Sequence, residues 1–141
     1  MLAELRRLGK VAEVGLSEVG VEVLEAARAV VPVVSVQNLY NLGDRHWEPV
    51  LEHCTTNDIG FIPWFPLSSG ALAGPAGALR RVAEDVGASP AEVALAWLLQ
   101  RSPVMVPIPG TSSVAHLEQN CAAAALHLDD GQRALLDESN G

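Results

Sequence analysis

The hydrophobic positions of this chain follow two alternating patterns. Short runs made almost wholly of apolar residues are separated by longer segments in which apolar residues return every third or fourth position. A short apolar run predicts a buried strand, and the longer period predicts an amphipathic helix. Strands are therefore expected at 11–16, 33–36, 61–67 and 104–108. Helices are expected at 1–8, 21–31, 49–57, 78–86 and 90–100, with two more after Ser113 and after Asp129-Asp130.

This alternation predicts the α/β class, with parallel strands joined by helical crossovers. None of the strand patterns alternates cleanly between polar and apolar residues, so we expect both faces of the sheet to be covered or curled inward. Ligands of such folds bind at the carboxyl ends of the strands. Here those ends carry polar or aromatic residues at Ser17, Gln37-Asn38, 64–69 and 110–113.

The stretch 104–120 contains the strongest candidate for a binding site. Gly110 allows close approach of the backbone to a ligand, and the hydroxyls of 111–113 can cap the helix that follows. The first turn of that helix would attract an anion. His116, Gln119 and Asn120 then lie on one helical face, where they could bind a base or a ribose. The alternative is a well-capped junction that binds nothing.

Composition narrows the range of partners. The net charge is −8 and Lys10 is the only lysine, so nucleic acid is not expected as a partner. Cys54 and Cys121 match no metal-ligand spacing, and both are expected to be buried free thiols. We therefore predict no metal site. The length of 141 residues predicts a single domain over residues 1–141.

The amino-terminal segment MLAELRRLGK has the pattern of a charged helix rather than of a signal peptide. No apolar run approaches the roughly 20 residues that a membrane span requires. The sequence therefore predicts a cytoplasmic protein that does not bind membranes.

Five segments occur in one order along nearly the whole chain: GKVAEVGLSE, VVSVQNLYNLGDR, GFIPWFPLSSGALAG, SPAEVALAWLLQRSPVMVPIPGTSSVAHLEQN and LDDGQRALLDE. Together they resemble the C-terminal half of the aldo-keto reductases. That family folds as a (β/α)₈ TIM barrel and transfers a hydride from NADPH to a carbonyl. The resemblance implies half of such a barrel, with four parallel βα units, and an oxidoreductase fragment that binds NADP(H).

The resemblance also implies roles for individual residues. Ser17 and Gln37 would bind the nicotinamide carboxamide, and Trp64 would stack on the nicotinamide ring. The remaining cofactor-binding positions are Phe65, Leu67 and Ser69 near the pyrophosphate, Gly110, Thr111, Ser112 and Ser113 near the 2′-phosphate, and His116, Gln119 and Asn120 around the adenosine.

Three positions depart from the family pattern. Glu18 stands where the family often has Asn, Gly110 where many members have Lys, and His116 where many have Arg. Lys at position 110 and Arg at position 116 would favour a 2′-phosphate. Because this chain has neither cation, NAD(H) is an alternative cofactor to NADP(H).

The family's catalytic Asp, Tyr, Lys and His belong to the first four barrel strands, which this chain does not match. Tyr40 is the only tyrosine and Lys10 the only lysine, and we expect them on opposite barrel faces. Lys10 would therefore not lower the pKa of Tyr40, as a Tyr–Lys proton donor requires. We assign no catalytic residue and expect negligible activity on a small carbonyl substrate without the N-terminal half.

Half of a barrel would expose two sheet edges and an apolar interior, including Val11, Val34, Val36, Ile62 and Val106. We therefore expect a partner, which would be a second copy or a complementing N-terminal half. Three functions stay open: a reductase half, a non-catalytic dinucleotide-binding module, and a self-associating structural half-barrel.

Overall fold

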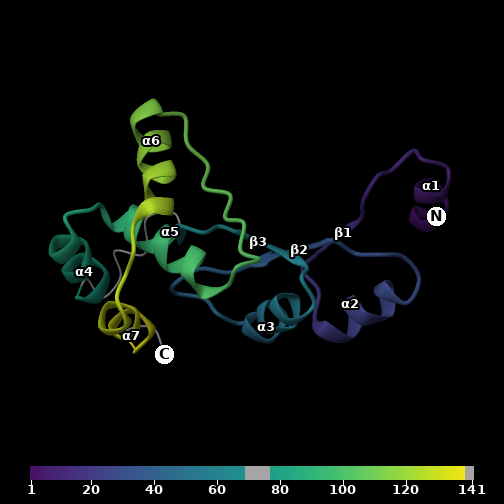
Figure 1. Ribbon diagram of the computed structural model, residues 1–141, viewed down its shortest axis with the longest axis horizontal. Coiled ribbons are helices and arrows are strands. Elements are labelled where there is room, and N and C mark those ends of the chain that lie inside the picture. Colours follow the sequence, from purple (N-terminus) through teal and green to yellow (C-terminus); the bar gives the residue numbers. More distant parts are fainter. Residues whose placement is uncertain (69–76, 139–141) are drawn as a thin grey trace.

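The structure is a computed structural model that describes residues 1–68 and 77–138. A parallel sheet forms its centre, in the order β1 (Gly15–Ser17), β2 (Ser35–Leu39), β3 (Gly60–Trp64). Helix α2 (Val21–Arg28) connects the first two strands, and α3 (Glu48–Thr56) connects the second and third (Figure 1). The predicted alternation of parallel strands and helices is confirmed for these three units.

The strand predicted at 104–108 does not form as a strand. Residue Met105 makes a single parallel bridge to Phe61, with Phe61 N donating to Val104 O and Val106 N to Phe61 O, both at 2.8 Å. The next bond of such a ladder would need an N–H from Pro63, which proline lacks. Pairing with β3 therefore ends after one residue, and the prediction of a fourth strand was wrong.

The other helices begin and end close to their predicted positions. They are α1 (Leu2–Arg7), α4 (Ala78–Val86), α5 (Pro90–Arg101), α6 (Val114–Ala122), the short 3₁₀ helix η2 (Ala123–Ala125) and α7 (Asp130–Glu138). A capping box opens α5, because Ser89 Oγ accepts from Glu92 N and Glu92 Oε2 accepts from Ser89 N. Gly9, just after α1, has φ +69°, as is common for a glycine that ends a helix.

The core lies where α3, α4, α5 and α7 pack with one face of the sheet. Val36 of β2 and Phe61 of β3 are fully buried there, together with Trp97 of α5 and Leu136 of α7. The expectation that Val36 would meet water was therefore wrong, because its side chain points into this cluster. In Figure 1, α1 lies at one end of the molecule and α6 projects away from α4, α5 and α7.

Residues 106–122, which we call the exposed segment, contrast with this core. None of them is buried. Exposed apolar side chains here include Val106 (52%), Ile108 (46%), Val114 (72%) and Leu117 (54%), and Val34 beside β2 is also exposed (43%). The expectation that Val34 and Val106 would be exposed is confirmed.

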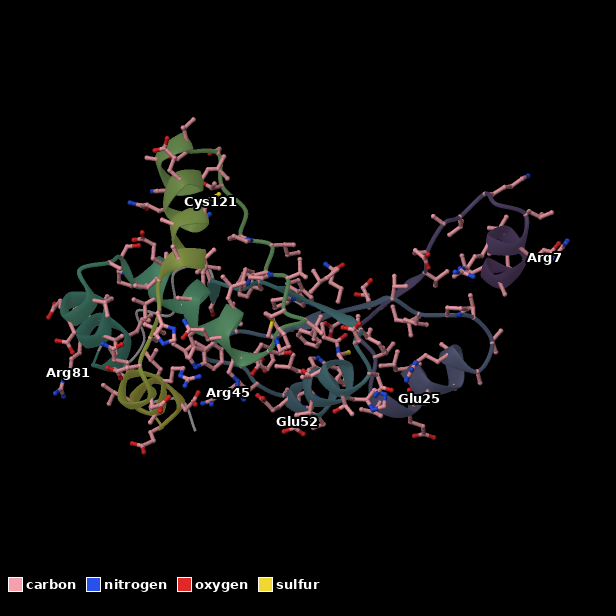
Figure 2. The ribbon with its side chains drawn as sticks, in the orientation of Figure 1. Arg7, Glu25, Arg45, Glu52, Arg81 and Cys121 are labelled. Carbon is pink, nitrogen blue, oxygen red and sulfur yellow. The ribbon has the colours of Figure 1, made fainter. Side chains whose placement is uncertain are left out.

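The two cysteines differ. Cys54 is buried in α3, as predicted, and burial raises the pKa of its thiol to about 11. Cys121 lies on α6 and is exposed (Figure 2), so the prediction of a buried thiol was wrong there. The reason is that α6 packs mainly against α5 and η2, and no described element covers its apolar side. No helix in residues 1–68 or 77–138 is long and apolar enough to cross a membrane.

Candidate functional site

The carboxyl ends of β1 and β2 are held together by one carbonyl group. Ser17 lies opposite Gln37 in the sheet register, and Gln37 O accepts hydrogen bonds from Ser17 Oγ and Glu18 N, each at 3.0 Å. Trp64 ends the neighbouring strand opposite Leu39. The sheet thus places Ser17, Gln37 and Trp64, three of the predicted site residues, at one edge. We call Ser17, Glu18, Gln37 and Trp64 the strand-end rim.

The rim offers hydrogen-bonding groups that the protein does not use. The half-buried Gln37 side chain makes no hydrogen bond to any described residue, and the Ser17 hydroxyl, which donates to Gln37 O, retains its acceptor lone pairs. An amide presents both donors and acceptors, so these two side chains can bind an amide-bearing ligand.

Glu18 ties all three strand ends together. Its Oε1 atom accepts from the Trp64 indole Nε1 and from the Leu39 backbone N, both at 2.6 Å. The sequence indicated only the loss of an amide at this position. The structure shows in addition that the carboxylate fixes the orientation of the Trp64 ring, which is half-buried.

Two buried asparagines support the rim from beneath, and sequence reasoning missed both roles. Asn38 is fully buried and forms two hydrogen bonds with the backbone of Val19, just beyond β1. Asn41 Nδ2 donates to the carbonyl of Phe65, just beyond β3. For Asn38 the available signal was an amide directly after an apolar run, because a buried amide needs hydrogen-bond partners. Asn41 lies beyond β2, and no such signal marks it.

Backbone strain concentrates at this edge. Glu18, Phe65 and Ser68 have φ of +53°, +60° and +49°, a region that non-glycine residues rarely adopt. Asp58, before β3, is the fourth such residue in the described chain. Strained conformations of this kind occur preferentially at binding and catalytic sites.

The remaining predicted residues separate into two groups. Phe65 is 42% exposed beside the rim, whereas Leu67 packs against the core, and Ser69 lies outside the described residues. The others lie on the exposed segment: Gly110, Thr111, Ser112, Ser113, His116, Gln119 and Asn120. No hydrogen bond between described residues joins this second group to the rim.

The exposed segment nevertheless has the predicted local form. Ser113 caps α6, its Oγ accepting from His116 N, and Thr111 Oγ1 accepts from Ser113 N at 3.1 Å. Residues 104–122 contain no lysine or arginine. The positive end of α6 is therefore the only feature of this segment, besides a protonated His116, that favours an anion.

Tyr40 does not resemble an acid catalyst. Its ring is fully buried, its hydroxyl donates to Glu48 at 2.5 Å, and burial together with this bond raises its pKa. The ring stacks on Trp97 at 6.1 Å. The environment thus keeps the phenol protonated.

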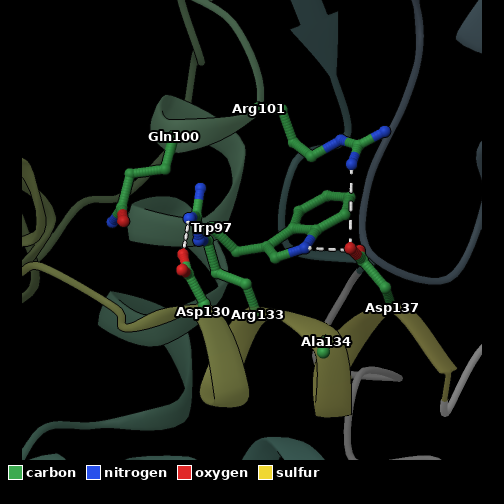
Figure 3. A pocket seen from close by; sticks show the side chains of 7 residues that line it. All are labelled: Trp97, Gln100, Arg101, Asp130, Arg133, Ala134 and Asp137. Carbon is green, nitrogen blue, oxygen red and sulfur yellow. Dashed lines mark hydrogen bonds and ion pairs between the residues drawn. The ribbon is translucent and has the colours of Figure 1, made fainter.

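A pocket of about 330 Å³ lies between α5 and α7, next to Trp97 (Figure 3). Its charged groups pair with one another: Arg101 with Asp137 at 3.7 Å, and Arg133 with Asp130. Trp97 Nε1 also donates to Asp137 at 3.0 Å. The two contacts of Asp137 join α5 to α7, whereas the Arg133–Asp130 pair lies within α7. This pairing leaves little net charge for a ligand. No group of three or more potential metal-ligating side chains occurs among residues 1–68 and 77–138.

Comparison with known proteins gives a consistent picture. The Aldo/keto reductase family model matches residues 1–140. An uncharacterized oxidoreductase of Schizosaccharomyces pombe is 52% identical over 137 residues, which are 97% of this chain and 45% of the relative. Pyridoxine 4-dehydrogenase of Escherichia coli is 43% identical over 137 residues, which are 97% of this chain and 48% of that enzyme.

Solved structures agree with this result. A thermostable aldo-keto reductase crystallised with epalrestat matches 99% of this chain with a TM-score of 0.91 and 33% identity, over 52% of its own length. An aldo/keto reductase from Klebsiella pneumoniae in complex with NADP and acetate matches 97% with a TM-score of 0.86 and 26% identity, over 51% of its own length.

The chain thus spans about half the length of these proteins, and its three-stranded sheet is part of a (β/α) barrel. The predicted α/β barrel class is confirmed, with three parallel strands where four were predicted. By the family match over residues 1–140 and the identity to its relatives, the chain belongs to the aldo/keto reductase family of oxidoreductases.

Proposed function

We propose that this chain is the nucleotide-holding half of an aldo/keto reductase, with the nicotinamide end of NADP(H) at the strand-end rim. The observation that carries the proposal is the unused Gln37 amide next to a half-buried indole held by Glu18. An amide-binding group beside an aromatic face suits a flat ring that carries a carboxamide. The Klebsiella pneumoniae enzyme binds NADP in its crystal structure, which supports the same ligand class here.

The adenosine end would bind along the exposed segment. The capped start of α6 presents backbone N–H groups, and His116, Gln119 and Asn120 are exposed or half-buried on the same helix. Because 104–122 contains no lysine or arginine, the segment lacks the charge-assisted hydrogen bonds that a 2′-phosphate usually receives. We therefore expect weaker discrimination between NADP(H) and NAD(H) than cationic residues at 110 and 116 would give.

Carbonyl reduction would need groups that these residues do not supply. The bound cofactor would provide the hydride, but the only tyrosine is buried with a raised pKa. We propose that a complementing half provides the proton donor and covers Val34 and the exposed segment. Burial of such apolar side chains stabilises an interface by about 25 cal/mol per Å².

Fluorescence titration tests nucleotide binding. NADPH should change the emission of Trp64, and the change should be absent in Trp64→Phe, while Trp47→Phe serves as the matched control. A flat titration in the unaltered chain would contradict the proposal. Carbonyl-dependent NADPH oxidation should be negligible for the chain alone and should appear when an N-terminal half from the Schizosaccharomyces pombe relative is added.

A second candidate is a self-associating half-barrel, which the exposed apolar residues of 106–117 favour. Sedimentation velocity distinguishes the two. A dimer that binds no nucleotide supports this candidate, and a species that binds NADPH supports the first.

A further inference from the structure

We propose that Glu18 and Trp64 form a specificity-determining pair that favours the oxidised, positively charged nicotinamide ring over the reduced, neutral ring. This inference rests on the proposed function, because it concerns the ring expected at the strand-end rim. It goes beyond that function by assigning the selectivity between the two redox forms to one carboxylate.

The geometry leaves half of the carboxylate available. Both hydrogen bonds that the Glu18 side chain accepts, from Trp64 Nε1 and Leu39 N, go to the same oxygen, Oε1. Oε2 has no hydrogen-bond partner among the described residues, and Glu18 is exposed. One oxygen thus fixes the indole while the other can interact with a ligand.

No cation neutralises this carboxylate. None of the ion pairs formed by described residues includes Glu18, and the segments 69–76 and 139–141 contain no lysine or arginine. The contrast with Glu48, which pairs with Arg101, shows that other acidic side chains of this chain do find partners. No cation of the described residues therefore pairs with the Glu18 carboxylate at the rim.

The backbone holds the side chain in this position. Glu18 has φ +53°, and its N–H donates to Gln37 O at 3.0 Å. A left-handed glutamate costs conformational energy, so the surrounding hydrogen bonds must maintain it. The two bonds to Oε1 then restrict the side chain as well. The carboxylate is thus a fixed charge rather than a mobile surface group.

A fixed carboxylate beside an indole favours a cation in two ways. It attracts a positive ring directly, and the indole face itself binds cations through its quadrupole. A neutral dihydronicotinamide ring gains neither interaction. The site should therefore prefer the oxidised nucleotide over the reduced one. This preference should be weaker when a neutral residue replaces Glu18.

The test compares two ligands that carry the same phosphates. Dissociation constants of NADP⁺ and NADPH are measured by equilibrium dialysis for the full chain and for Glu18→Gln, and the ratio of the NADPH constant to the NADP⁺ constant is compared. Because the phosphates cancel in this ratio, it reports the ring alone. We expect the ratio to fall by roughly three- to tenfold in Glu18→Gln, as expected for one charge near a partly exposed ring.

Controls separate charge from structure. Glu18→Asp keeps the charge, so its ratio should stay nearer that of the unaltered chain than the ratio of Glu18→Gln does. Glu22→Gln removes an exposed charge from the first turn of α2 and should leave the ratio unchanged. In the free protein, the indole ¹H–¹⁵N resonance of Trp64, assigned with Trp64→Phe, should move upfield in Glu18→Ala, which confirms the hydrogen bond independently of any nucleotide.

Two failures have different meanings. If both nucleotides bind and the ratio is the same in Glu18→Gln, this inference is overturned while the proposed function stands. If the unaltered chain binds neither nucleotide, the proposed function falls and this inference falls with it. An unmoved Trp64 resonance in Glu18→Ala would also overturn the inference.

Discussion

Helices α5 and α6 begin with the same kind of cap but lie in opposite environments. Each has a serine cap whose hydroxyl accepts from the backbone N–H three residues later. Yet α5 buries its residues from Val93 to Leu98, whereas no residue of α6 is buried. Local signals thus determine where a helix starts, and only tertiary partners determine whether it is covered. The partners of α5 lie within this chain, whereas α6 contacts mainly α5 and η2, and we propose that a partner chain covers its apolar side.

The largest effect on the free energy of unfolding should come from a substitution in the buried helix α5. Trp97 is buried, stacks on Tyr40 and donates to Asp137, so Trp97→Ala should lower the free energy of unfolding by about 3–5 kcal/mol. Leu117→Ala, on the exposed face of α6, should change it by less than about 0.5 kcal/mol. Urea unfolding followed by circular dichroism measures both. Equal losses would mean that α6 is packed in solution.

The two thiols sharpen the same comparison. At pH 8, a thiol with the pKa of Cys54, about 11, is ionised at least about a hundredfold less than a model-peptide cysteine, and it is also buried. Cys121 is exposed. Iodoacetamide should therefore alkylate Cys121 at least about a hundredfold faster than Cys54, as followed by peptide mass spectrometry. Similar rates at both positions would show that the covered side opens readily.

The two serine caps should differ by a smaller amount. Ser89→Ala removes a capping box at the start of a buried helix and should cost about 1 kcal/mol of unfolding free energy. Ser113→Ala should have almost no effect on global unfolding, because α6 can fray without exposing the core. A larger loss at Ser113 than at Ser89 would contradict this assignment.

The smallest effect concerns acid stability. The Ser89 side-chain hydrogen bond, followed by the Ser89 backbone bond, lowers the pKa of Glu92. A lowered pKa contributes stability above the unfolded value of about 4.3, and this contribution is lost as the pH falls through the folded value. Glu92→Gln should therefore flatten the decrease of the unfolding midpoint below about pH 4.5. An unchanged slope in this variant would exclude Glu92 as the source.

The sequence allowed much of the fold to be predicted because its local signals agree with the tertiary structure. The caps at Ser89 and Ser113, the glycine after α1 and the apolar stripe of α5 each fix a boundary. The apolar run at 104–108 could not show that the fourth strand is absent, because the cause lies on the neighbouring strand, where Pro63 lacks the N–H that further pairing requires. The prediction that Cys121 is buried was wrong for a similar reason, because periodicity shows the apolar side of a helix but not what covers that side.

The site was predictable in part. Ser17, Gln37 and Trp64 could be placed at one edge, because parallel strands end together. The bond from Trp64 to Glu18 spans 46 positions, and nothing local indicates it. Likewise, the bonds of Asn38 and Asn41 to the rim backbone require the register of the sheet, which only the structure gives.

Peptide-resolved hydrogen exchange of the chain, with and without saturating NADP⁺, tests the central claim most directly. We expect slow exchange in α3 and α5 under both conditions. Exchange across 106–122 should be fast in the free chain and should slow when the nucleotide binds. Exchange in 106–122 that is already as slow as in α5, or that does not respond to the nucleotide, would contradict it.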